Sequence, residues 1–304
     1  MNLILGSSSM IGKQLCEFVP DSIGIQHTYY DLTDLPSCYD IFKEYNFETV
    51  YHLAGYNGGI SLNLAKPADI FYTTSQINLN VLRCAQLFKV KRIVNVLASC
   101  SYPNLGNQFL RECDLFHGWP DPTVEPHGLA KRILLAYSRQ LHKQYGLNTI
   151  NAILTNCYGP GDRFDLSRTK VVGAAVRRIC DAKRDNLPSV TFLGTGKPLR
   201  EIMYCKDAAS CLVKLAANYT DYMNPINLGS DQEISIYDLV YKIKDLVGYN
   251  GEILWDDSKP DGQMRKKLET VKMRQWISHE MTPLDDGLKN TIKYYQDIGQ
   301  YLDR

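Results

Sequence analysis

The stretch Asn2-Leu3-Ile4-Leu5-Gly6-Ser7-Ser8-Ser9-Met10-Ile11-Gly12 decides how this chain is expected to fold. A short apolar run is followed by a turn of small residues, and a helical pattern continues to Phe18. Small residues let the backbone approach a pyrophosphate, and the N-terminus of the next helix attracts its charge. The turn therefore predicts a dinucleotide-binding unit, although Ser9 stands where a glycine is usual. The expected cofactor contacts in it are Gly6, Ser8, Ser9, Met10, Ile11 and Gly12.

The alternation of strand and helix patterns continues through the first half of the chain. Strand patterns cover 23–27, 49–54, 92–97 and 149–154, and helical patterns cover 68–88 and 128–145. This order predicts a parallel sheet with right-handed crossovers. Ligands bind at the carboxyl ends of such strands. Further cofactor contacts are therefore expected at Leu53, Ala54, Thr155 and Cys157.

The sequence changes character after Pro160. A polar loop at 161–169 precedes a helical pattern at 171–182, a short strand pattern at 190–193 and a second helical pattern at 235–247. Residues 225–229 look like a strand that returns to the sheet. We predict an α/β protein with a Rossmann-type doubly wound parallel sheet over 1–160, a returning segment near 200–230, and a smaller α/β substrate domain over 161–304.

Net charge, apolar runs and cysteine spacing exclude several classes of function. The 304 residues carry a formal net charge of +1, so there is no basic field for nucleic acid or an anionic membrane. No leader and no apolar run of membrane-spanning length is visible. The nine cysteines are scattered without a Cys-x-x-Cys pair, which predicts reduced thiols in the cytoplasm and no metal or disulfide framework.

The end of the second expected strand bears on the choice of cofactor. An acidic residue there would bind the ribose 2′-hydroxyl of NAD, but this chain has His27 and no carboxylate until Asp31. That favours NADP(H), with Ser7, Ser8 and His27 as phosphate donors. NAD(H) stays an alternative because no arginine is present either. Asp31 and Leu32 are expected beside the adenine, although residues 31–34 are equally typical of a helix N-cap.

Two further stretches suggest chemistry. Val124 to Lys131 places His127 and Lys131 four residues apart on one face of a helix that begins at Pro126. Leu97-Ala98-Ser99-Cys100-Ser101-Tyr102-Pro103 ends a strand pattern with small polar residues. A proton donor beside a lysine, facing a polar strand end, suits carbonyl reduction. The alternative is a surface histidine beside a solvated lysine.

Several ordered motifs carry a family resemblance. They are Tyr51-His52-Leu53-Ala54, Gly58-Gly59-Ile60, Lys66-Pro67-Ala68-Asp69, Cys100-Ser101-Tyr102-Pro103, Pro122-Thr123-Val124-Glu125-Pro126, Thr155-Asn156-Cys157-Tyr158-Gly159-Pro160, Arg177-Arg178, Gly194-Thr195-Gly196-Lys197-Pro198-Leu199-Arg200-Glu201 and Lys259-Pro260-Asp261-Gly262. With them the chain resembles the extended short-chain dehydrogenase/reductases, above all the GDP-L-fucose synthase group. The resemblance implies an NADP-dependent homodimer that acts on a GDP-linked 4-keto sugar, with the helices at 68–88 and 128–145 as its interface.

The departures from this family fall on the catalytic residues. The family tyrosine is His127 here, its serine is Ala98 with Ser99 beside it, and a family histidine matches Lys170. Lys131, Cys100 and Asn156 keep the family types. We therefore expect His127 to act as general acid in reduction at C4, with Lys131 holding the nicotinamide ribose. Ser99 or Cys100 would bind the sugar oxygen.

The resemblance also supplies the expected substrate contacts. The matching positions are Asn156, Lys170, Val171, Arg178, Arg200 and Lys266. Their cations would meet the GDP phosphates, since arginine in particular binds phosphate with two parallel hydrogen bonds. Any of them is equally compatible with an ordinary surface charge.

Three functions remain open at this point. The first is an NADPH-dependent C4 reductase of a GDP-4-keto deoxyhexose or heptose in surface-polysaccharide biosynthesis, without C3/C5 epimerisation. The second is a nucleotide-sugar epimerase or dehydrogenase with tightly bound NAD. The third is a relative that binds nucleotide sugars and has lost catalysis.

Overall fold

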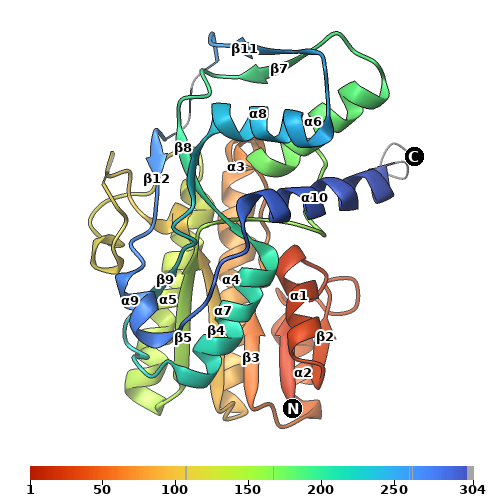
Figure 1. The fold of residues 1–304 in the computed structure, drawn as a ribbon. Coiled ribbons are helices and arrows are strands. Elements are labelled where there is room, and N and C mark those ends of the chain that lie inside the picture. The colour runs from red at the N-terminus through yellow and green to blue at the C-terminus, as the bar shows by residue number, and fades with distance from the viewer. Residues whose placement is uncertain (107, 167, 260, 262, 300–304) are drawn as a thin grey trace.

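The structure is a computed structural model, in which all residues except 107, 167, 260, 262 and 300–304 are described (Figure 1). Two residues of the family motif Lys259-Pro260-Asp261-Gly262, Pro260 and Gly262, therefore lie outside the described residues. The chain forms a large sheet unit with a smaller unit at the carboxyl ends of its strands (Figure 1).

The large unit is built on a six-stranded parallel sheet in the order β2-β1-β3-β4-β5-β9. The prediction of a Rossmann-type α/β fold is confirmed. The second and third strands end two residues earlier than the pattern suggested. The strands are β1 Asn2–Leu5, β2 Ser22–Ile25, β3 Thr49–His52, β4 Arg92–Ala98, β5 Asn148–Leu154 and β9 Ile226–Leu228.

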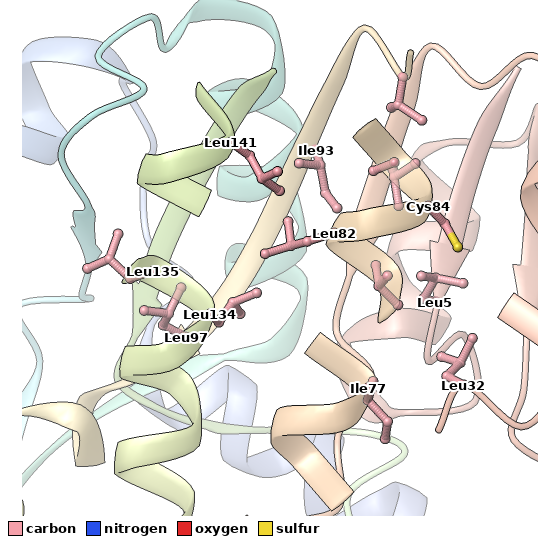
Figure 2. Close-up of a cluster of buried hydrophobic side chains, with 14 of the residues drawn as sticks. Leu5, Leu32, Ile77, Leu82, Cys84, Ile93, Leu97, Leu134, Leu135 and Leu141 are labelled. Carbon is pink, nitrogen blue, oxygen red and sulfur yellow. The ribbon is translucent and has the colours of Figure 1, made fainter. Parts of the chain in front are cut away.

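Helices cover both faces of this sheet. Helices α1 (Met10–Phe18) and α7 (Cys205–Asn218) pack on one face. Helices α2 (Leu35–Glu44), α4 (Pro67–Leu87) and α5 (Glu125–Tyr145) pack on the other. Figure 2 shows leucines and isoleucines of α4 and α5 meeting those of the central strands. Burial of these apolar side chains stabilises the packing of the helices on the sheet, and so fixes the carboxyl ends of the strands relative to α4 and α5.

Helix α5 begins and ends where its sequence signals place it. Pro126 occupies its first turn, where a missing N–H costs no hydrogen bond. Gly146 ends it with φ of 70°, a left-handed conformation that glycine adopts without a Cβ clash. His142 and Lys143 lie in the last turn, where the helix dipole favours positive charge. These local signals fix the position of His127 in the first turn of the helix.

The smaller unit has a core of its own between helices and short strands. Helices α6 (Val171–Arg184), α8 (Ile236–Val247) and α10 (Leu284–Gly299) pack around the parallel pair β7 (Ser189–Leu193) and β11 (Glu252–Asp256). Strand β8 (Leu199–Tyr204) pairs with β6, β10 and β12. These three are β6 Asn156–Tyr158, β10 Glu233–Ser235 and β12 Arg265–Lys266.

The chain crosses between the two units more than once. Helix α7, strand β9 and helix α9 (Val271–Trp276) all follow residue 161 in sequence and pack with the first unit. The division of the chain at residue 160 therefore stays a prediction. The remaining elements are α3 Ile60–Ala65 and the short 3₁₀ turns η1 Ser99–Ser101 and η2 Glu112–Asp114. None of the helices in the described part of the chain is long and apolar enough to cross a membrane.

Candidate active site

The turn after β1 is shaped to receive a phosphate group. Gly6 has φ of 88°, and a Cβ on Gly12 would lie 2.2 Å from the Gly6 carbonyl oxygen. The Ser9 hydroxyl caps α1 by accepting from the Gly12 N–H at 3.1 Å. The first turn of α1 contains no acidic residue, so its N-terminal dipole is free to attract an anion. This backbone cradle fits the pyrophosphate of a dinucleotide.

A cavity of about 150 Å³ lies at the carboxyl ends of the sheet strands, next to this turn. It brings together eight residues that the sequence predicted, from the cofactor, catalytic and substrate sets. They are Met10, Ile11, Leu53, His127, Lys131, Thr155, Cys157 and Lys170. Ala98, which stands at the position of the family serine, also lines the cavity. The other lining residues were not predicted as site residues, and they are Gly55, Asn57, Val96, Leu97 and Leu154.

His127 and Lys131 are both buried in the wall of this cavity, each with 4% of its surface exposed. Burial first, and then the charges of Lys131, Lys170 and Lys266, lowers the pKa of His127 to about 3. Burial lowers the pKa of Lys131 to about 8, against a smaller opposing effect of the Cys100 thiol. The positive charge of Lys131 is the second cause of the lowered histidine pKa, after burial. At neutral pH the imidazole is neutral and the lysine is charged.

A buried hydrogen-bond chain holds the helix that carries this pair. The His52 ring contacts the Asn78 side-chain oxygen through Nε2 at 3.0 Å, and Asn78 Nδ2 donates to the Ala130 carbonyl at 3.1 Å. All three residues are inaccessible to solvent. Asn78 was not predicted as a site residue, because α4 also contains Gln76 and Asn80 and the sequence pattern does not show which amide bonds to α5. The chain links β3, α4 and α5 at the residue before Lys131.

The polar end of β4 lies directly against α5. A Cβ on Gly128 would lie 2.5 Å from the Cys100 carbonyl oxygen, so the helix and η1 are in close contact. Ser99 is 3% exposed, whereas Cys100 is half-buried. Ala98, which stands where the family has serine, lines the cavity itself. Neither Ser99 nor Cys100 is among the residues that line it.

Three of the predicted substrate cations lie near one another, and the fourth lies elsewhere. Lys170 lines the cavity, and Lys266 of β12 is paired with Arg200 of the neighbouring strand β8. Burial lowers the pKa of Lys266, with smaller effects of Cys100, Arg200 and Lys170. Arg178 instead donates to the Thr191 carbonyl at 2.8 Å and stacks over an aromatic ring of β7. The structure therefore brings Lys170, Lys266 and Arg200 together and leaves Arg178 apart.

Comparison with known proteins adds evidence to this geometry. The model of the NAD dependent epimerase/dehydratase family matches residues 2–229. The chain belongs to this family. GDP-L-fucose synthase of Escherichia coli is 31% identical over 273 residues, which cover 87% of this chain and 85% of that protein.

Solved structures of the family have the same fold. A GDP-L-fucose synthetase from Naegleria fowleri bound to NADP has a TM-score of 0.91 at 26% identity, covering 100% of this chain and 94% of that one. A GDP-6-OMe-4-keto-L-xylo-heptose reductase from C. jejuni has a TM-score of 0.90 at 25% identity, with 97% of each chain covered. The expected family resemblance is thereby confirmed.

At the adenine end the epimerase/dehydratase fold leaves fewer free donors than the sequence suggested. The Ser7 hydroxyl donates to the Ile25 carbonyl at 3.1 Å, so it is already used within the protein. His27 and Ser8 are exposed. Asp31 accepts from both the N–H and the hydroxyl of Thr33, at 2.8 and 2.7 Å. The N-cap alternative applies to Asp34, whose carboxylate caps α2.

The remaining predicted contacts flank the site. Ala54 follows β3, and Leu32 is buried with its carbonyl accepting from Asn80 at 3.0 Å. Asn156 begins β6, and Val171 begins α6 immediately after Lys170. Among the residues that the structure describes, no three His, Cys, Asp or Glu side chains gather as metal ligands would.

Asp162, in the polar loop at 161–169, lies near the cavity residue Lys170 and was not predicted as a site residue. Its Oδ1 accepts from the Arg163 N–H at 2.8 Å, and its Oδ2 is buried without a hydrogen-bond partner. Burial raises the pKa of Asp162 to about 6, against an opposing effect of Lys170. Lys170 therefore lies within electrostatic reach of both Asp162 and His127.

Acid is expected to destabilise this protein through its buried imidazoles. Burial lowers the pKa of His127 and that of His52 to about 3, below the value of about 6.5 of a histidine in an unfolded chain. The stability that neutral burial provides is present above pH 6.5 and is lost as pH falls from 6.5 towards 3. Each histidine should contribute about 1 kcal/mol per pH unit in that window. Urea unfolding at pH 7, 6, 5 and 4.5 measures the slope. His127→Phe should reduce it, and an unchanged slope would contradict burial of the neutral ring.

Proposed function

We propose that this protein is an NADPH-dependent reductase of the C4 carbonyl of a GDP-linked 4-keto sugar, a deoxyhexose or heptose used in surface-polysaccharide biosynthesis. An oxidoreductase that uses NADP(H) agrees with the family and with the relatives described above. The single observation that carries the proposal is the cavity in which a neutral histidine and a charged lysine meet the cofactor turn and Lys170.

The pKa order of the pair indicates how a proton reaches the substrate. When bound, NADPH supplies the hydride. The neutral His127 ring donates its N–H proton to the C4 oxygen. Among the described residues Lys131 forms no hydrogen bond with the ring, so the lysine must approach the ring in the substrate complex to replace the proton from its ammonium group. The net change in the protein is one proton lost from Lys131. His127 thus acts as the general acid that contacts the substrate, and Lys131 is the source of the proton.

Reduction without epimerisation is the second part of the proposal. Epimerisation at C3 and C5 of the sugar needs a base that removes a proton from the carbon, which exchanges that hydrogen with solvent, and an acid that returns a proton to the opposite face. Cys100 is present at the family position, but the family histidine is replaced by Lys170. A 4-keto substrate incubated in D₂O without NADPH should therefore gain no deuterium at C3 or C5. Exchange detected by NMR or mass spectrometry would contradict this part and favour an epimerase.

The reductase activity itself is tested with a panel of GDP-4-keto sugars and either reduced cofactor. NADPH oxidation should appear with one or more deoxyhexose or heptose substrates, and the product should be the 4-hydroxy sugar by NMR. Turnover without net cofactor oxidation, by protein purified with NAD that does not exchange, would replace the reductase by an NAD-dependent epimerase. Binding of both ligands without turnover would indicate a relative that has lost catalysis.

We also propose a cytoplasmic homodimer that associates through α4 and α5. Exposed apolar side chains on α4, Phe71, Tyr72 and Leu79, lie where such a contact would form. All nine cysteines are free, which agrees with a reducing compartment. Sedimentation at micromolar concentration distinguishes a dimer from a monomer, and Tyr72→Glu should shift a dimer towards the monomer.

A further inference from the structure

Glu201 is an acidic side chain at the junction of the two units with no part in the chemistry above. It lies in β8 and is inaccessible to solvent. Its Oε1 accepts from the Asp231 N–H at 2.9 Å, and its Oε2 accepts from the Leu268 N–H at 3.0 Å. No lysine or arginine in the described part of the chain forms a salt bridge with it. Burial raises the pKa of this carboxyl group, while the two N–H groups oppose that effect.

A buried carboxylate without a cation is costly to fold, because two N–H groups replace its hydration only in part. The surroundings are nevertheless built around it. A Cβ on Gly229 would lie 2.4 Å from Glu201 Oε1, so only glycine leaves room for the side chain there. An apolar side chain of similar size would fill the same space without the cost of burying a charge. The carboxylate therefore points to a role beyond holding the fold together.

The hydrogen-bond partners of Glu201 belong to segments that also contain predicted site residues. Leu268 follows strand β12 by two residues, and in that strand Lys266 pairs with Arg200 of β8. Arg200 is the residue immediately before Glu201. On the other side, the hydroxyl of Thr155, which lines the cavity, donates to the Glu201 carbonyl at 3.0 Å. One residue thus connects the cavity wall to the strand that bears Lys266.

We propose that Glu201 is a positioning residue, which holds β12 in register on β8 so that Lys266 and Arg200 together meet the diphosphate of the substrate. The inference rests on the proposed function for the identity of that substrate. The carboxylate does not touch the ligand. It fixes the backbone at Leu268, just beyond the C-terminal end of this two-residue strand, whereas the ion pair of Arg265 with Glu233 of β10 holds the first residue of the strand.

The test compares Glu201→Gln with a matched control. A glutamine amide has one acceptor oxygen, so one of the two N–H groups loses its partner. GDP binding measured by calorimetry should weaken about tenfold, whereas NADPH binding stays within about twofold. Asp207→Asn is the control, because Asp207 is also buried and accepts from the Thr282 N–H at 2.9 Å, but on α7, where its partners do not line the cavity. It should lower the melting temperature and leave GDP binding unchanged.

A double-mutant cycle shows whether Glu201 acts through Lys266. In a Lys266→Gln background, Glu201→Gln should weaken GDP binding by less than about twofold. The inference would be overturned if Glu201→Gln weakened GDP binding equally in both backgrounds. It would also be overturned if Glu201→Gln lowered the melting temperature but kept the wild-type affinity for GDP. If the glutamine variant does not fold, Glu201→Asp keeps the charge but is too short to reach both N–H groups, and the same GDP measurement decides.

The readout separates this inference from the proposed function. Loss of GDP affinity in Glu201→Gln, in a protein that reduces no 4-keto sugar, would support the positioning role and contradict the reductase. Failure of the wild-type protein to bind GDP would overturn the positioning role.

Discussion

Replacement of His127 by phenylalanine is expected to lower the kcat of sugar reduction at least about 100-fold, because proton transfer by a placed side chain contributes that much or more. NADPH affinity should remain within about twofold of the wild-type value, since the cofactor cradle lies on another segment. The two side chains are similar in size, so the loss should reflect chemistry rather than a cavity in the buried wall. Stopped-flow NADPH oxidation and fluorescence titration of NADPH measure the two quantities.

A second histidine of the same helix provides the control. His142 lies near the C-terminus of α5, where its Nδ1 contacts the Leu147 carbonyl at 3.0 Å, and it does not line the cavity. His142→Phe should retain wild-type turnover. His127→Tyr introduces the family's own proton donor and should retain measurable reduction. Near-normal turnover by His127→Phe with intact NADPH binding would remove this residue from the mechanism.

The parts of the fold that the sequence predicted are those set by neighbouring residues. The first strand, its turn and α1 follow from a run of eleven residues, and α5 follows from Pro126 at its start and Gly146 at its end. The central strands were located because apolar runs between turn signals need no distant partner to be recognised. Strands β2 and β3 end two residues before the predicted ends, where the chain leaves the sheet while the predicted strand pattern still continues.

The features that escaped prediction depend on contacts between distant segments. Strand β6 exists because β8, more than forty residues later, pairs with it. The role of Glu201 depends on backbone N–H groups of two other segments, which no spacing reveals. The same reason applies to Arg178, which was predicted as a substrate contact and whose side chain bonds to the Thr191 carbonyl of β7. Burial of His127, which decides its charge state, is likewise a property of the packed cavity.

The rate of reduction should depend on pH through Lys131. Because burial lowers the pKa of this lysine to about 8, its ammonium is the main form at pH 7 and is lost as pH rises through 8. The acid form is the proton source, so kcat should be level below pH 7 and should fall about tenfold per unit well above pH 8. An ordinary lysine would give no such decline until pH 10. Initial rates at saturating NADPH and sugar, from pH 6 to 10, define the profile.

Lys131→Met removes both the proton source and the charge beside His127. Turnover should fall at least about 100-fold and lose its decline above pH 8. Removal of a neighbouring positive charge should also raise the pKa of His127. Lys143→Met is the matched control, since Lys143 is exposed in the last turn of the same helix. It should leave the pH profile unchanged. A wild-type profile that stays flat from pH 7 to 10 would contradict Lys131 as the source of the proton, even if His127→Phe proved inactive.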